Sequence, residues 1–117
     1  MKKLFSSFYF AISGIVQCCR TEKNFQLQAC IAITVIFGGW VFNIASIDWV
    51  ALLLCCAMVL CLEMVNAAIE KLADVVHLSF HPGIKNVKDI AAGAVLIASV
   101  ISIIIALIIF IPKMFFK

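Results

Sequence analysis

Residues 90–111 read IAAGAVLIASVISIIIALIIFI and decide the class of fold. The stretch carries no charged side chain, and it is as long as the roughly 20 residues that a helix needs to cross a bilayer. Lys88 and Asp89 precede it, and Pro112 and Lys113 follow it. We therefore expect a transmembrane helix over about 90–111, stopped by Pro112.

The rest of the chain shares this apolar character. Of its 117 residues 66% are hydrophobic, and the mean hydropathy is +1.21, whereas soluble domains have about 45–50% apolar residues. Two further apolar runs predict spans over about 27–44 and 49–74, and Pro82-Gly83 predicts a loop over 79–87. The length allows a single domain over residues 1–117 with an all-α membrane fold. Three spans enclose little space for a nucleotide or a lipid, so size alone predicts a homo-oligomer.

The N-terminal segment has the pattern of an amphipathic helix. Apolar residues recur at helical spacing from Leu4 to Cys19, and serines and a glycine lie on the opposite face. Two lysines followed by apolar residues also resemble a secretory signal, but the interrupting polar residues disfavour that alternative. We expect a helix over about 2–20 that lies in the membrane interface.

The basic residues predict the orientation in the membrane. Seven of the nine belong to one side, and two belong to the other. The first group is Lys2, Lys3, Arg20, Lys23, Lys71, Lys85 and Lys88, and the second is Lys113 and Lys117. By the positive-inside rule, the N-terminus and the second loop face the cytoplasm and the C-terminus lies outside.

The cysteines and the charge exclude several classes of function. The six cysteines include two adjacent pairs, most of them lie in apolar runs, and none forms a C-x-x-C motif. This arrangement disfavours disulfides and zinc, and favours small apolar residues packed between helices. The net charge of +3 comes without a basic block, so the sequence gives no support for nucleic-acid binding.

The informative polar residues lie at the end of the second predicted span. Glu63, Asn66, Glu70 and Asp74 are spaced at i, i+3, i+7 and i+11, which places them within an arc of about 80° on one helix face. Acidic groups at membrane depth are costly and usually face a partner or a wet cavity. One interpretation is catalysis, with Glu63 as the deeper group that accepts a proton. The other is that these side chains only hold helices together in an oligomer.

Three charged residues accompany this face on the same side of the membrane. Glu22 precedes the first span, and Lys88 and Asp89 begin the third. Carboxylates with a lysine at one depth form a plausible site for Mg²⁺ and phosphates, because Mg²⁺ is commonly held by one or two carboxylates together with substrate phosphates. The sequence contains no Gly-x-x-x-x-Gly-Lys loop, so an ATP site here is not of the P-loop type.

Two motifs resemble those of a known family. They read Glu63-x-x-Asn66-x-Ala68-Ile69-Glu70-x-x-x-Asp74 and Lys88-Asp89-Ile-Ala-Ala-Gly-Ala-Val. They are similar to the signature of the prokaryotic diacylglycerol kinases, a family that includes undecaprenol kinases. The resemblance covers nearly the whole chain.

The resemblance implies a homotrimeric lipid kinase of the bacterial cytoplasmic membrane. It implies ATP as phosphoryl donor, Mg²⁺, and active sites shared between subunits at the cytoplasmic interface. Glu63 matches the catalytic carboxylate, and Glu22 and Glu70 match the metal-binding residues. The positions that match nucleotide contacts are Asn66, Phe80, His81, Lys88 and Asp89, besides Glu22 and Glu70.

The departures from the family pattern concern the acceptor lipid. Ala67 replaces a small hydroxyl residue that many members carry, Ser79 replaces an acid of the enteric members, and Ala92-Gly93 is closer to the undecaprenol kinases. Undecaprenol and diacylglycerol both remain candidate acceptors, with undecaprenol favoured. The rival functions are a proton- or ion-coupled transporter with Glu63 as carrier site, and a non-catalytic membrane subunit. Asp74 and His77 receive no assigned role, and His77 is expected to be interfacial.

Overall fold

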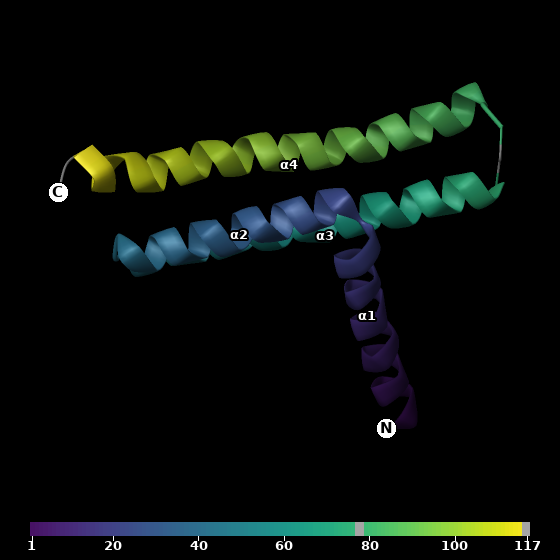
Figure 1. Cartoon of the computed structure of the whole chain (residues 1–117), viewed down its shortest axis with the longest axis horizontal. Coiled ribbons are helices and arrows are strands. Elements are labelled where there is room, and N and C mark those ends of the chain that lie inside the picture. The colour runs from purple at the N-terminus through teal and green to yellow at the C-terminus, as the bar shows by residue number, and fades with distance from the viewer. Residues whose placement is uncertain (77–78, 116–117) are drawn as a thin grey trace.

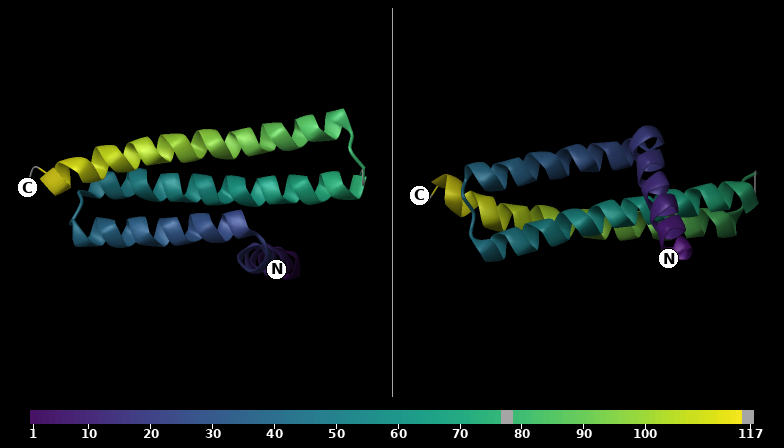
Figure 2. Two further views of the ribbon diagram at one scale, coloured as in Figure 1. Left: turned by 45° about the horizontal axis from the view of Figure 1, so that its top comes forward. Right: turned by 90° about the horizontal axis from the view of Figure 1, so that it is seen from below.

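The chain forms four helices and no strand over residues 1–76 and 79–115, the part that the computed structural model describes. They are α1 (Lys2–Thr21), α2 (Lys23–Val41), α3 (Ser46–Val76) and α4 (Pro82–Phe115). Helices α2, α3 and α4 run side by side along the long axis, and α1 projects across that axis (Figures 1 and 2). The expected all-α fold, with one additional helix before three long ones, is confirmed.

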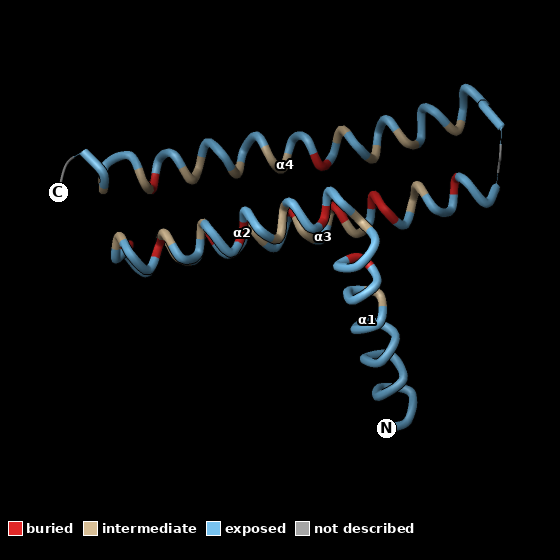
Figure 3. Tube along the Cα trace, viewed as in Figure 1, coloured by how far each residue is buried: buried red, intermediate tan, exposed pale blue. Residues whose placement is uncertain are grey.

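Three helices are long and apolar enough to cross a membrane. They are α2, α3 and α4, with 19, 31 and 34 residues. Only 6% of the most apolar window of α4 is buried inside the protein, and α1 and α4 are exposed along most of their length (Figure 3). Apolar side chains that face outward along such helices are what a lipid surrounding requires, so the chain is a membrane protein.

Helix α2 begins and ends a few residues earlier than expected, and two boundaries of α4 differ from the sequence prediction at prolines. Helix α4 continues through Pro112 to Phe115, so the prediction that Pro112 stops it is wrong. Transmembrane helices tolerate proline where neighbouring groups satisfy the freed carbonyl, and here the proline lies in the last turn. Helix α4 also begins at Pro82 rather than after residue 87, because the first helical position needs no backbone N–H and suits the fixed φ of proline.

The apolar core lies at the end of the bundle where α2 meets α3. Ile44, Leu52 and Ile109 are buried there, packed against partly buried neighbours that include Trp49 and Phe110. The chain turns between α2 and α3 through Asn43, whose φ is 53°, a left-handed value that asparagine tolerates better than most residues.

Helix α3 is the centre of the arrangement. It contacts α1, α2 and α4, and it carries six buried residues, more than any other helix. Toward its C-terminal end α3 extends beyond the junction of α1 and α2, with only α4 beside it (Figure 1).

Candidate functional site

The polar face of α3 becomes more exposed toward the end of the helix. Glu63 and Asn66 are buried, with 6% and 8% of their surface exposed. Glu70 is half-buried and Asp74 is exposed. The Oδ1 atom of Asn66 is buried and has no hydrogen-bond partner within the described residues. A buried carbonyl oxygen without a partner is costly, so a polar ligand or a further chain that reached Asn66 would meet an unsatisfied acceptor.

Glu63 lies among polar neighbours from two other segments. The side-chain amide of Gln28, in α2, lies within hydrogen-bonding reach of its carboxylate. Glu70 and Glu22 lie close enough for their charges to act on Glu63. The three carboxylates therefore form one electrostatic group, which brings together the residues that the sequence predicted for catalysis and metal binding.

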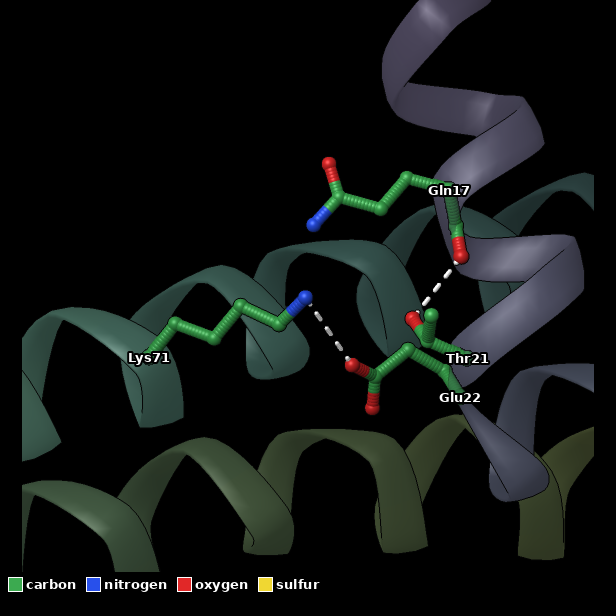
Figure 4. A network of polar contacts seen from close by, with 4 residues as sticks. All are labelled: Gln17, Thr21, Glu22 and Lys71. Atoms are coloured by element: carbon green, nitrogen blue, oxygen red, sulfur yellow. Dashed lines mark hydrogen bonds and ion pairs between the residues drawn. The ribbon is translucent and has the colours of Figure 1, made fainter.

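Glu22 stands between α1 and α2 and is the only residue that separates them. Its backbone is extended, with φ −100° and ψ 107°, and caps both helices. Its Oε1 atom pairs with Nζ of Lys71 on α3 at 3.3 Å (Figure 4). The break between the helices turns the carboxylate toward α3, where Glu63 and Glu70 lie.

Two ion pairs lie where α3 leads to α4. Nζ of Lys88 donates to Oδ1 of Asp74 at 2.7 Å, and Nζ of Lys85 donates to Oδ2 of Asp89 at 2.6 Å. Lys88 is also near enough to Glu70 for the two charges to interact. The structure therefore brings Lys88 to the acidic face of α3, as the sequence predicted, but through Asp74, which had no assigned role.

Phe80 and His81 occupy the turn before α4, and both are exposed. Nδ1 of His81 accepts a hydrogen bond from the Gly83 backbone N–H at 3.0 Å, so its ring caps the first turn of the helix, where N–H groups lack helical partners. Glycine suits position 83, because a Cβ there would lie 3.2 Å from that ring. His77 lies outside the described residues.

Carboxylate oxygens are the type of ligand that a hard cation such as Mg²⁺ prefers. Among the described residues no three His, Cys, Asp and Glu side chains are grouped as a metal site. Mg²⁺ does not need such a cage, since it retains waters and binds one or two carboxylates plus phosphates. Glu22 and Glu70 supply such oxygens beside Glu63. The roles of these residues remain predictions.

A cavity of about 170 Å³ lies between α2, α3 and α4. Its lining is almost entirely apolar and includes Ala32, Cys55 and Cys56. Gln28, whose side chain lies beside the carboxylate of Glu63, also lines it. The cavity therefore begins one side chain away from the candidate catalytic group.

Gln28, Lys71 and Lys85 contact candidate site residues without having been predicted to do so. The i, i+4 spacing of Lys85 and Asp89 is a local signal that the sequence does carry. The contacts of Gln28 and Lys71 join different helices, and one sequence contains no signal for them.

Comparison with known proteins identifies the class. Residues 9–110 match the family described as prokaryotic diacylglycerol kinase, and the chain belongs to this family. It is therefore a lipid kinase, and the transporter and non-catalytic subunit are set aside.

The individual relatives are named either undecaprenol kinase or diacylglycerol kinase. Undecaprenol kinase of Bacillus subtilis (strain 168) is 40% identical over 114 residues, covering 97% of this chain and 93% of that protein. Diacylglycerol kinase of Synechocystis sp. is 33% identical over 103 residues, covering 87% of this chain and 59% of that protein. Diacylglycerol kinase of Helicobacter pylori (strain J99) is 29% identical over 96 residues, covering 82% of this chain and 75% of that protein.

Proposed function

We propose that the protein transfers the γ-phosphoryl group of ATP to the hydroxyl of undecaprenol at the cytoplasmic face of a bacterial membrane. The observation that carries the reaction is the buried Glu63, which lies near Glu70 and Glu22 and whose neighbour Gln28 lines an apolar cavity. An acid at this depth suits the one point where an apolar alcohol has to meet a polar phosphate. The 40% identity with a relative named undecaprenol kinase supports that acceptor over diacylglycerol.

In the proposed step, the carboxylate of Glu63 accepts the proton of the lipid hydroxyl as the hydroxyl oxygen attacks the γ-phosphorus. The bond between that phosphorus and the bridging oxygen of ADP breaks, and ADP leaves with the electron pair. General base catalysis of this kind contributes about 10²–10⁴-fold to the rate. Gln28, within hydrogen-bonding reach, holds the carboxylate in place.

The remaining polar residues position the nucleotide and neutralise its charge, the main task in phosphoryl transfer. The Asn66 side chain offers an amide to a phosphate or to the lipid head. Lys88 carries a positive charge that moves from Asp74 to a phosphate, with Asp89, Phe80 and His81 at the nucleotide. Glu22 and Glu70 would hold a Mg²⁺ ion, which would supply further neutralisation of the phosphate charge.

Assembly and location are part of the same proposal. We infer a homotrimer, because the chain is small and resembles a family with shared active sites. The N-terminus faces the cytoplasm and the C-terminus lies outside, in accord with the distribution of basic residues. Helix α1, exposed along nearly all its length, lies at the membrane surface and guides lipid heads toward Glu63.

The test is a phosphorylation assay with purified protein in detergent, Mg²⁺, γ-labelled ATP and either undecaprenol or diacylglycerol. We expect label in undecaprenol, and a loss of at least about 100-fold in Glu63→Gln with the oligomer intact. Asp48→Asn makes the same chemical change in the first turn of α3 and serves as the matched control. Label only in diacylglycerol would correct the acceptor. Retained turnover in Glu63→Gln would remove Glu63 as the base.

A further inference from the structure

The Glu22–Lys71 ion pair has a consequence for metal binding. Glu22 is one of two carboxylates proposed to hold the cation, yet its Oε1 atom already has the Lys71 ammonium at 3.3 Å. In Figure 4 the two side chains approach each other end to end, across the space between α3 and the α1–α2 junction. A carboxylate held in this way does not offer the same oxygen to a second cation.

The backbone on the Glu22 side of the pair is fixed. Its N–H donates to the Cys18 carbonyl at 3.1 Å, and its carbonyl accepts from the Gln26 N–H at 3.0 Å. The Gln26 side chain adds a hydrogen bond to the Cys19 carbonyl at 2.8 Å, so α1 and α2 are tied together at the junction. The carboxylate, with 25% of the side chain exposed, therefore has little freedom to leave.

The Lys71 side of the pair is free to move. Half of the lysine side chain, 49%, is exposed, and it ends a flexible four-carbon stem with a strongly hydrated ammonium group. The lysine can therefore swing into water at small cost. Glu22, in contrast, would lose its ion-pair partner while the like charges of Glu63 and Glu70 remained nearby, unless another cation arrived.

We propose that Lys71 is a positioning residue that holds the Glu22 carboxylate toward the site in the unloaded protein and is exchanged for the divalent cation on loading. This inference rests on the metal role of Glu22 in the proposed function. Lys71 acts as a competitor of the metal as well as a tether, so its removal should tighten cation binding. Catalysis by the loaded enzyme would then require Lys71 to be displaced.

The experiment measures Mn²⁺ binding to the purified protein in detergent, without ATP or lipid, by the electron spin resonance of free Mn²⁺. In Lys71→Met we expect the Kd for Mn²⁺ to fall about two- to five-fold, the range that partly exposed ion pairs account for. Lys71→Arg keeps the charge and should bind Mn²⁺ like the wild type. Lys23→Met removes a charge next to Glu22 from an exposed lysine and should change the Kd by less than that range.

A second pair of variants separates the two proposals. If Glu22→Gln binds Mn²⁺ as the wild type does, Glu22 is no metal ligand, and both the metal assignment and the role of Lys71 are overturned. If Glu22→Gln weakens binding but Lys71→Met leaves it unchanged or weaker, the metal assignment survives and the exchange is refuted. The exchange also requires that Lys71→Met leave the Kd for Mn²⁺ unchanged in a Glu22→Gln background. The Glu22–Lys71 ion pair is already absent there, so removing the lysine has no further effect through it.

Discussion

Two adjacent glycines in α2 allow the packing at the core end of the bundle to be tested. A Cβ built on Gly39 would lie 2.9 Å from Trp49 and 3.1 Å from Ile44, whereas a Cβ on Gly38 would meet only Phe110, at 3.5 Å. The first distances are shorter than normal van der Waals contact, and the last is ordinary. Ile44 is buried and Trp49 packs against the core, so neither has much room to retreat.

Alanine is expected to stabilise the protein at position 38 but not at position 39. Replacing glycine by alanine within a helix stabilises it by about 1 kcal/mol, and this gain applies to both positions. Overpacking costs about 1–3 kcal/mol and applies only at position 39. Gly38→Ala should therefore raise the free energy of unfolding by up to about 1 kcal/mol. The free energy of unfolding of Gly39→Ala should lie about 1–3 kcal/mol below that of Gly38→Ala. The helix contribution is the same in both variants and cancels in this comparison.

The assay is reversible unfolding in mixed detergent micelles, with the sodium dodecyl sulfate fraction increased and the helical circular dichroism recorded. Turnover per folded molecule should be unchanged in both variants, because the substitutions lie at the opposite end from Glu63. Equal stability of the two variants, or greater stability of Gly39→Ala, would refute the close packing of α2 on Trp49.

Two further predictions concern the substrates. Ala32→Phe places a phenyl ring in the 170 Å³ cavity. Because a cavity of about 150 Å³ is filled by a single benzene, the KM for undecaprenol should rise while the KM for ATP stays the same. Ala57→Phe, at an exposed position of α3, is the control, and equal lipid kinetics in both variants would exclude the cavity from acceptor binding. Lys88→Ala removes the proposed phosphate partner and leaves Asp74 without the lysine it pairs with, so the KM for ATP should rise or turnover should fall. The control Lys113→Ala, near the other end of α4, should change neither quantity. Wild-type kinetics in Lys88→Ala would remove Lys88 from the site.

The fold was largely predictable because the surrounding lipid or interface determines where apolar residues occur along each helix, and this pattern can be recognised in the sequence. The uncharged run 90–111 and the stripe from Leu4 to Cys19 each reflect one surrounding, hydrocarbon or interface, along a whole helix. The errors in α4 fell at the two prolines. Proline is read as a helix stop because it lacks an N–H, but at the first turn that donor is not needed, and in the last turn little helix remains to be disrupted.

The site was predictable in part, and for a physical reason. The spacing of Glu63, Asn66 and Glu70 on one helix is fixed by 3.6 residues per turn, so the sequence indicates their shared face. The approach of Glu22 depends on a single extended residue that turns α1 away from α2. Whether Lys71 or Lys88 meets a given carboxylate depends on how helices pack, and one sequence contains no record of packing.

The two ends of the bundle are held together by different forces, and this division suits a kinase in a membrane. At the core end, Ile44, Leu52 and Ile109 pack together. Such contacts associate helices even in lipid, where the hydrophobic effect between them is absent. At the other end, the ion pairs Lys71–Glu22 and Lys88–Asp74 join α3 to the α1–α2 junction and to α4. Exposed ion pairs are worth about 0–1 kcal/mol each, so little stability is lost when their charges move to a nucleotide and its metal. In the proposed reaction, the packed end keeps the helices in register while the charged end exchanges its partners at every turnover.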